Sequence, residues 1–402
     1  MRILISGASI AGPVLAYWLT RYGFDVTVVE RAPTLRKTGG HAVDLFRPAM
    51  EISAKMGVLP RIEALATGTA RLTMYREGRT KPIRIDLTKI YAATSDRHVE
   101  IMRDDLSEIY YDAARDDVEY LFGDSITAIE HDGTVTFEHA PAHAFDVIVG
   151  ADGLHSNVRR LTFGDEADLT RFLGGYLAVV SAPKSLAATN EMIGHLGLGR
   201  LAAIYTAEHL DDARAVFMFR SKEELDYDHR DSLRQKELLR DAFAGMHPEV
   251  DGWLEEIDRT PAFYFDAISQ LRLDRWSRRR VTLVGDAGYC PGPAVGGSTS
   301  LAVLGAYVLA GELAEADGDH LRAFAAYELQ MSESVHRSRT FARGAAKGLI
   351  PGSRAGVWAL SRGVQLVSLI PGSLSRAVAK LNTKGIRMHD SMPVPDYTGI
   401  DV

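Results

Sequence analysis

Three short glycine-containing segments, two of which also carry an aspartate, have spacings that suit a phosphate-containing ligand. They are Gly7-Ala8-Ser9-Ile10-Ala11-Gly12, Gly150-Ala151-Asp152-Gly153 and Gly285-Asp286-Ala287. Glycine lets a backbone approach a phosphate closely, and a carboxylate accepts hydrogen bonds from ribose hydroxyls. Because the segments are far apart in the sequence, we predict that they hold the two ends of one extended dinucleotide. FAD is the dinucleotide that this arrangement favours.

The first glycine segment follows an expected strand and begins an expected helix. Residues 2–6 form an apolar run, and residues 11–22 have the periodicity of a helix. Gly7 allows a tight turn, while free amides at the helix start face a pyrophosphate that the helix dipole also favours. Ser9 stands where the usual pattern has its middle glycine. The strand, turn and helix together still favour a bound ligand over a glycine turn without one.

The next expected strand supplies an acidic residue. Residues 25–30 are typical of a buried parallel strand. This strand ends in Glu30, whose carboxylate is well placed to bind a ribose hydroxyl. The loop from Arg31 to Asp44 follows and contains Gly40, against which a cofactor can lie. Lys37 in this loop is a candidate contact for the phosphate of NADPH, and a solvated lysine is the alternative.

The composition limits the class of protein. With 402 residues, of which 46% are apolar, the chain is long enough for two domains and a tail. A net charge of −7 with dispersed basic residues argues against a nucleic-acid partner. A single cysteine, Cys290, rules out an internal disulfide and a cysteine-based metal site, and we expect no metal. Because neither an export signal nor an apolar stretch of ~20 residues is present, we expect a cytoplasmic protein without a membrane anchor.

Hydrophobic periodicity divides the chain into a parallel α/β part and a sheet-rich part. Residues 146–149 and 280–284 are typical of buried parallel strands, whereas residues 72–90 and 174–265 are strand-like in an alternating pattern. We therefore predict an α/β fold: a Rossmann-like FAD-binding domain assembled from discontinuous segments, an inserted sheet-rich substrate domain and a C-terminal helical segment. The predicted boundaries are 1–71, 98–172 and 270–340 for the FAD-binding domain, 72–97 and 173–269 for the substrate domain, and 341–402 for the C-terminal helices.

The remaining polar and aromatic side chains identify no catalytic base. The dispersed histidines, which include His41, His195 and His229, are expected on the surface or in loops. Asp44 can approach a flavin edge or a substrate, and a turn-forming carboxylate is an equally good explanation. Four aromatic residues on expected strands either line a cavity or, as the stronger expectation, pack within the sheet: Tyr176, Tyr205, Phe217 and Phe219.

The second and third glycine segments resemble the signatures of one enzyme family. Residues 150–159 and Gly285-Asp286-Ala287, followed by Pro293 and Gly296, closely resemble the group A FAD-dependent aromatic-ring monooxygenases, the family of p-hydroxybenzoate hydroxylase. The resemblance covers nearly the whole chain. Through Gly39-Gly40, Asp44 and Arg103, the chain looks most like the tetracycline-inactivating and polyketide hydroxylases. This resemblance implies modification of an antibiotic-like molecule.

The resemblance implies FAD contacts from several segments. Glu30 would hold the adenosine ribose, Arg103 would reach FAD from the start of its helix, and Asp286 would bind the ribityl or pyrophosphate region. The amides of residues 296–299 would face the flavin pyrimidine. The family commonly has Gln at position 297, Gly at position 298 and His in place of Tyr289, so fine contacts differ here. The predicted cofactor-binding residues are Gly7, Ser9, Ile10, Ala11, Gly12, Glu30, Arg31, Lys37, Gly40, Asp44, Arg103, Asp152, Gly285, Asp286, Pro293, Gly296, Gly297, Ser298 and Thr299.

The resemblance also implies the reaction. NADPH or NADH visits transiently, through a motif around Asp152 that the family uses for both nucleotides, and reduces FAD. Dioxygen then adds to the flavin, and the resulting C4a-hydroperoxyflavin transfers one oxygen atom to an electron-rich, phenolic or polycyclic small molecule. The protein positions the reactants and excludes water. We expect a monomer, because the thioredoxin-like extension of larger phenol hydroxylases is missing.

Other activities on the same scaffold stay open. A flavin-dependent dehydrogenase, epoxidase or halogenase is the main alternative, although Gly252-Trp253-Leu254 lacks the continuation that halogenases carry. A nicotinamide dehydrogenase without flavin leaves Gly285-Asp286 unused, and a non-catalytic flavin-binding sensor also fits the fold. The C-terminal apolar runs are broken by Arg362 and Pro371, so we expect packing against the substrate domain rather than membrane attachment.

Overall fold

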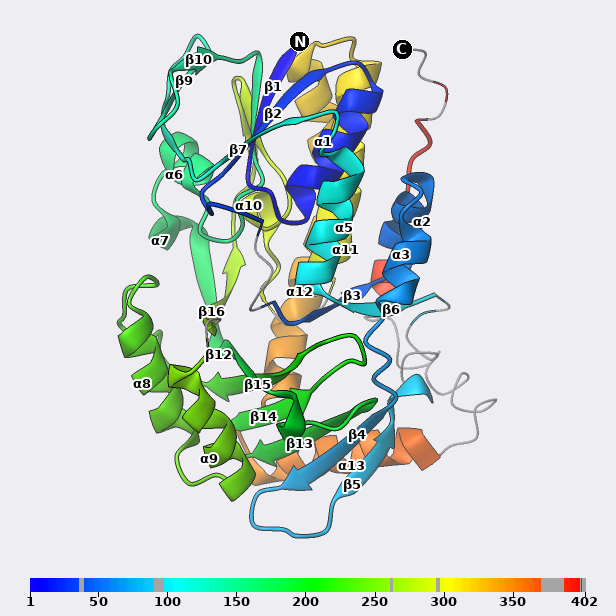
Figure 1. The fold of residues 1–402 in the computed structure, drawn as a ribbon, viewed down its shortest axis with the longest axis vertical. Coiled ribbons are helices and arrows are strands. Elements are labelled where there is room, and N and C mark those ends of the chain that lie inside the picture. Colours follow the sequence, from blue (N-terminus) through cyan, green and yellow to red (C-terminus); the bar gives the residue numbers. More distant parts are fainter. Residues whose placement is uncertain are drawn as a thin grey trace.

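The computed structural model stacks two sheet-based halves along the long axis of the molecule (Figure 1). The upper half holds the N-terminus and a mostly parallel sheet, and the lower half holds a mostly antiparallel sheet. The predicted α/β class is confirmed. The structure describes residues 1–35, 40–89, 95, 97–260, 263–293, 297–369, 387–397 and 399.

The sheet of the upper half has six strands in the order β17-β18-β11-β1-β2-β7. β1 pairs in parallel with β2 and β11, and β11 pairs in parallel with β18. Nearly every residue of β1 and β11 is buried, because helices or other elements cover both faces. The bounds are β1 (Arg2–Ser6), β2 (Asp25–Glu30), β7 (Glu119–Phe122), β11 (Val147–Gly150), β17 (Ser277–Arg278) and β18 (Val281–Leu283).

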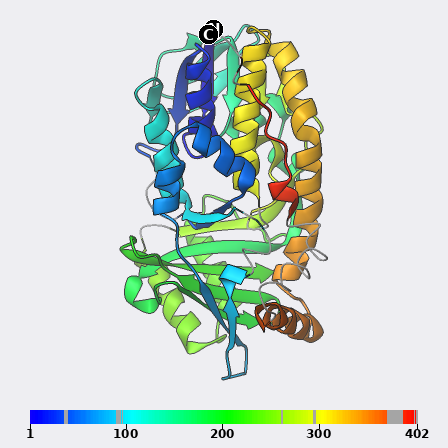
Figure 2. The same cartoon turned by 90° about the vertical axis from the view of Figure 1, so that its right-hand side faces the viewer.

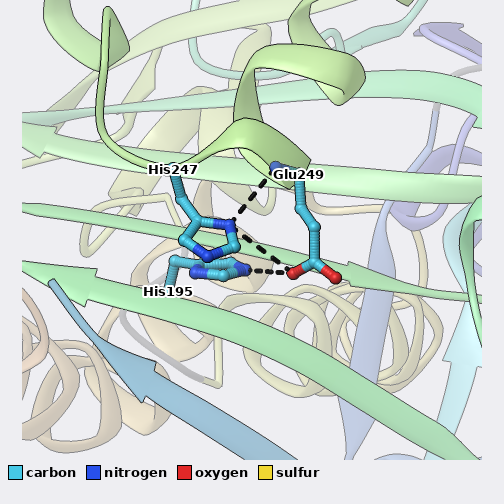
Figure 3. A group of neighbouring side chains, drawn as sticks. All are labelled: His195, His247 and Glu249. Atoms are coloured by element: carbon cyan, nitrogen blue, oxygen red, sulfur yellow. Dashed lines mark hydrogen bonds and ion pairs between the residues drawn. The ribbon is translucent and has the colours of Figure 1, made fainter. Parts of the chain in front are cut away.

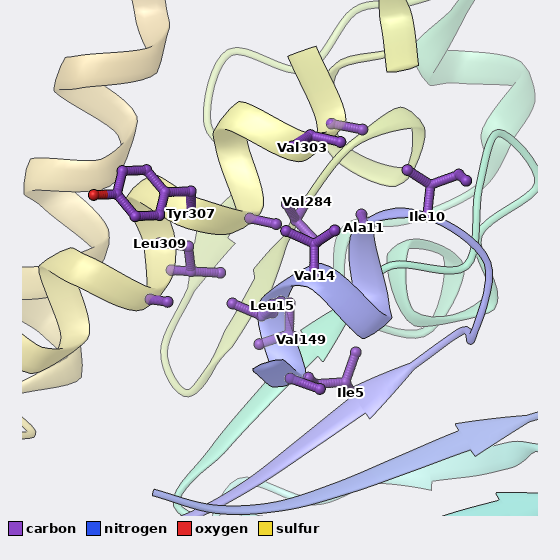
Figure 4. Packing of buried hydrophobic residues seen from close by; sticks show 14 of the residues in the cluster. Ile5, Ile10, Ala11, Val14, Leu15, Val149, Val284, Val303, Tyr307 and Leu309 are labelled. Atoms are coloured by element: carbon purple, nitrogen blue, oxygen red, sulfur yellow. The ribbon is translucent and has the colours of Figure 1, made fainter. Parts of the chain in front are cut away.

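Long helices flank this sheet. Val14 and Leu15 pack in one cluster with Ile5 of the sheet and Val303 of α11, so the glycine loop before α1 is anchored by a continuous apolar core (Figure 4). α11 is buried along almost its whole length because α1 lies on one side of it and α12 on the other. The helices are α1 (Ala11–Arg21), α5 (Arg103–Ala114), α11 (Ser298–Glu315) and α12 (His320–Leu349).

The sheet of the lower half has seven strands in the order β16-β12-β15-β14-β13-β4-β5. Its outer face packs against two helices, α8 (Ser232–Phe243) and α9 (Pro248–Glu255), and we call the opposite face, which meets α12, the inner face. The strands are β4 (Arg71–Arg76), β5 (Ile83–Asp86), β12 (Thr170–Pro183), β13 (Glu191–Gly197), β14 (Arg200–Tyr205), β15 (Asp212–Arg220) and β16 (Phe263–Leu271).

Several elements join the two halves. β3 (Ala42–Leu45) and β6 (Val99–Met102) form a two-stranded sheet between them, and α12 runs from the upper half to the lower sheet (Figures 1 and 2). α13 (Arg354–Leu369) contacts β5, as expected for the C-terminal helices, and α15 (Arg387–Asp390) lies against α12 and α2. The smaller elements are α2 (Arg47–Lys55), α3 (Leu59–Ala64), β8 (Ile126–Ile129), β9 (Thr134–Phe137), β10 (His143–Ala144), α6 (Asn157–Phe163), α7 (Glu166–Leu169) and α10 (Asp286–Tyr289).

Two local expectations differ from the structure. Residues 42–45 form a strand rather than the end of a loop, because β6, more than fifty residues away in sequence, pairs with them. The turn-forming explanation for Asp44 is therefore wrong. α12 was not predicted, and it continues across residue 340, where we placed a domain boundary.

Candidate cofactor and substrate site

The first glycine segment is held by backbone contacts that leave no room for a side chain at either of its two glycines. A Cβ atom on Gly12 would lie 1.9 Å from the carbonyl oxygen of Gly7, and one on Gly7 would lie 2.5 Å from that of Ala151. Gly7 also has a φ of +109°, which disfavours other residues. No side chain caps α1 at Ile10, so its first amides are available to a phosphate.

Glu30 is fixed beside this loop. Its carboxylate accepts hydrogen bonds from the backbone N–H groups of Ala8, at 2.9 Å, and Ala32, at 2.9 Å. These two bonds hold the acid at the carboxyl end of β2, next to the glycine turn, where the sequence predicts a ribose contact. Arg31 follows on the exposed surface.

Asp152 already serves the chain itself. One carboxylate oxygen accepts bonds from the amides of Asn157, at 2.9 Å, and Val158, at 3.1 Å, and the other accepts the Ser156 hydroxyl at 2.5 Å. Burial raises the pKa of Asp152, while these hydrogen bonds act in the opposite direction. The Asp-x-x-x-Ser spacing before α6 is therefore a helix-capping signal, and the cofactor contact of Asp152 stays a prediction.

Arg103 and Asp286 converge on the glycine segment from two other parts of the chain. Arg103 begins α5 and donates from Nη2 to the Ser9 hydroxyl over 3.1 Å. Asp286 begins α10 after Gly285, whose φ is +67°. Burial raises the pKa of Asp286, and the Arg103 guanidinium opposes that shift. The tertiary structure thus brings together a guanidinium, a carboxylate and the glycine turn that is predicted to bind phosphate.

The start of α11 forms the far end of the same site. Gly297 is the N-cap residue with a φ of +83°, no side chain caps the helix, and Ser298 and Thr299 are its first residues. A Cβ atom on Gly285 would lie 3.2 Å from Ala302 and 3.4 Å from Ala11, so this glycine lies close to both α11 and α1. Two uncapped helix starts and the tight glycine contacts fit an extended dinucleotide. Pro293 precedes this region, whereas Lys37 and Gly296 lie outside the described residues.

The inner face of the lower sheet directly touches residues 40–42, which we call the cofactor loop. Arg214 of β15 donates from Nε to the carbonyl oxygen of Gly40 over 3.1 Å, and the Tyr205 hydroxyl of β14 accepts the amide of Ala42 at 2.7 Å. Both side chains are buried. His41 lies between these contacts, and burial, with a smaller effect of Arg103, lowers its pKa to about 4. The inner face therefore lies directly against residues 40–42.

Strand alternation decides which aromatic residues reach this site. Tyr176, Phe217 and Phe219 lie on the outer face and pack against α8 and α9, which confirms sheet packing for these three. On each strand, the neighbours of these outward residues point inward. On β16, for example, Phe265 faces outward, whereas Tyr264 approaches His41 with ring centroids 6.3 Å apart. Sequence reasoning missed the inward residues Arg214, Tyr264 and Asp266. The signal for Arg214 was an arginine between two alanines in a largely apolar strand.

A charged network joins the two halves beside the site. His155, after β11, bonds through Nδ1 to Glu166 at 2.8 Å and through Nε2 to Asp266 of β16 at 3.0 Å. Burial alone would lower the pKa of His155, but these two carboxylates raise it to about 10. Glu166 also accepts Arg159 Nη2 at 2.7 Å. The network ties α6 and α7 to the lower sheet.

His195 was expected on the surface or in a loop, and that expectation is wrong. It lies on β13, 3% exposed, and its Nε2 is 2.8 Å from Oε2 of Glu249 (Figure 3). His247 Nδ1 accepts the Glu249 amide at the start of α9, and the ligating atoms of all three side chains lie within 4.8 Å of one another. They lie beside α9, against the outer face. The absence of a bound metal stays a prediction.

None of the helices within the described residues has the length and apolar character needed to cross a bilayer.

Comparisons with known proteins agree with this geometry. The FAD binding domain family model matches residues 1–322. An uncharacterized protein of Mycobacterium tuberculosis is 41% identical over 346 residues, covering 84% of this chain and 91% of the relative. A flavin-dependent monooxygenase of Legionella longbeachae is 36% identical over 344 residues, covering 85% and 87%. The crystal structure of tetracycline destructase Tet(55) matches with a TM-score of 0.82 and 31% identity over 98% of both chains.

Proposed function

This chain belongs to the FAD binding domain family and is a flavin-dependent monooxygenase of aromatic compounds, and from that premise we propose that its own substrate is a bulky polycyclic phenol. We further propose that NADPH or NADH reduces its flavin during a transient visit. We also propose that the protein is a monomer that acts in the cytoplasm and that it is divided into the domains predicted above, except that α12 crosses the boundary at residue 340.

The contact between the inner sheet face and the cofactor loop carries this proposal. Arg214 and Tyr205 hold residues 40–42, so the inner face lies against the loop that borders the flavin site. Tyr264 and Asp266 add hydrogen-bonding groups to the same face, with the Tyr264 hydroxyl donating to Asp266 over 3.3 Å. These polar groups on a face that is otherwise largely apolar suit the phenolic and enolic oxygens of a polycyclic substrate, and a similar structure is that of a tetracycline destructase.

We propose that separate parts of the chain share the binding of FAD. The uncapped start of α1 binds the pyrophosphate, Glu30 binds the ribose, and the uncapped start of α11 faces the flavin ring. Bound FAD supplies the redox chemistry that activates dioxygen. Arg103 adds positive charge at the junction, and the sheet cover keeps water away from the reacting atoms.

An absorbance spectrum and a reductant titration test this function. We expect purified protein to carry FAD, and one compound in a panel of polycyclic phenols that includes a tetracycline to accelerate its anaerobic reduction by NADPH or NADH. On admission of air that compound should gain one oxygen atom, detected by mass spectrometry. Reduction that is indifferent to every panel member would contradict the substrate class, and failure to take up FAD would overturn the cofactor assignment.

A further inference from the structure

One buried histidine has no hydrogen-bond partner within the part of the chain that the structure describes. His389 of α15 is 1% exposed, and among the described residues neither of its ring nitrogens has a partner. Burial lowers its pKa to about 4, so the imidazole is neutral at physiological pH, with one N–H donor and one acceptor nitrogen. A buried polar group without a partner is costly, and such groups require an explanation.

The imidazole lies directly on the start of α11. A Cβ atom on Gly297 would come within 1.9 Å of His389 Cε1, so only a glycine at this position leaves room for the ring. The family resemblance leads one to expect Gln at position 297, and that side chain would overlap the imidazole. The absence of a side chain at 297 and the presence of His389 therefore occur together.

The ring is held in place by its neighbours. It stacks on Phe46 with centroids 5.2 Å apart, and Phe341 of α12 meets it edge-on at 5.7 Å. Arg47 anchors the next residue, because its Nε donates to the carbonyl oxygen of Asp390 over 2.7 Å. The Arg47 amide and the Ser95 hydroxyl both bond to the Asp390 carboxylate. The orientation of His389 is thus set before any ligand arrives.

The two groups that meet here call for the same kind of ligand. The uncapped start of α11 presents N–H donors with positive dipole character, and His389 presents one donor and one acceptor. The pyrimidine edge of a flavin carries an N–H group between two carbonyl oxygens. An edge of that pattern satisfies both the helix amides and the imidazole.

We propose that His389, brought by the C-terminal segment, completes the flavin site by hydrogen-bonding the pyrimidine edge of FAD beside the start of α11. This inference rests on the proposed use of α11 to face the flavin ring. It makes the C-terminal segment part of the cofactor site, although the family match ends at residue 322.

Replacement of His389 by phenylalanine tests the contact. His389→Phe keeps the ring stacked between Phe46 and Phe341 and removes both nitrogens. We expect the dissociation constant for FAD to rise by about tenfold and the flavin midpoint potential to become more negative, because a donor to a pyrimidine carbonyl stabilises the reduced flavin. His389→Asn, which restores one donor and one acceptor, should lose less. His139→Phe, at an exposed histidine of the upper half, should change neither quantity.

A second variant tests the anchoring. Arg47→Met releases the Asp390 carbonyl without removing the imidazole, so it should also weaken FAD binding, and the double variant with His389→Phe should lose little more than either alone. This keeps the proposal testable if the phenylalanine variant does not fold. Arg47 is a positioning residue in this scheme.

The outcomes separate this inference from the function itself. Wild-type protein that binds no FAD refutes the proposed function before any variant is made. If wild-type binds FAD and His389→Phe binds it equally tightly at an unchanged potential, the pyrimidine contact is wrong. Tighter FAD binding by His389→Phe also overturns the contact, because the ring would then occupy the flavin's place.

Discussion

The two halves of the molecule build their parts of the site in different ways. The upper half positions ligand-binding groups through backbone contacts, such as the one between Gly12 and Gly7. The lower half positions them through side chains on alternating strand residues, so that Arg214 faces the cofactor loop while Ala213 and Ala215 face α8 and α9. A backbone site tolerates almost no change of residue, whereas a side-chain site can change its chemistry without changing its fold.

The largest expected effect comes from breaking a backbone contact. In Gly12→Ala the single added carbon meets a carbonyl oxygen at 1.9 Å, so α1 must move away from the glycine loop. We expect loss of FAD from the purified protein and a lower melting temperature. Gly252→Ala is the matched control, because a Cβ there meets nothing within 4 Å. Full FAD content in Gly12→Ala would show that the tight contact is unnecessary.

A charged side chain at the junction should matter less than the backbone contact. Arg103→Met removes the guanidinium beside Ser9 and Asp286, and we expect the dissociation constant for FAD to rise roughly 10- to 100-fold, the range of a lost charge-assisted hydrogen bond. Arg115→Met, at the exposed opposite end of α5, should leave affinity unchanged when both are measured by flavin fluorescence. If Arg103→Met and wild type bind FAD with equal affinity, Arg103 is not part of the cofactor site.

The inner sheet face should affect substrate rather than cofactor. In Arg214→Met we expect FAD content to be kept and the substrate-dependent acceleration of flavin reduction to fall on the order of tenfold, because the cover over residue 40 loosens. Arg220→Met, at the exposed end of the same strand, is the control. Stopped-flow reduction measures both. If Arg214→Met loses both FAD and the substrate-dependent acceleration, the lower half also holds the cofactor, and the two halves do not have separate roles.

The smallest expected effect concerns the network that joins the halves. The pKa of His155 is about 10 in the folded protein and about 6.5 when unfolded, so its contribution to stability is complete below pH 6.5 and is lost as pH rises toward 10. The melting temperature of His155→Gln should therefore fall less between pH 7 and 10 than that of wild type. The control variant His139→Gln should show the same fall as wild type. An unchanged pH dependence in His155→Gln would contradict this role.

The local pattern predicted several elements with their bounds. β1 spans residues 2–6 and β2 spans residues 25–30 as expected, because a run of apolar residues between turns is a local property. The strand nature of residues 42–45 could not be predicted, since it depends on pairing with β6. The same holds for Arg214 and Tyr264, whose inward direction follows from the register of the lower sheet.

The sequence by itself determined the fold class, the cofactor and the family, because glycine turns, buried strands and a strand-final acid are written in consecutive residues. Only the tertiary structure decided which side chains meet above the cofactor loop and that His389 lies on Gly297, more than ninety residues earlier. The physical reason is that backbone contacts depend on residue size at fixed local positions, whereas side-chain contacts depend on strand register and on where a distant segment packs.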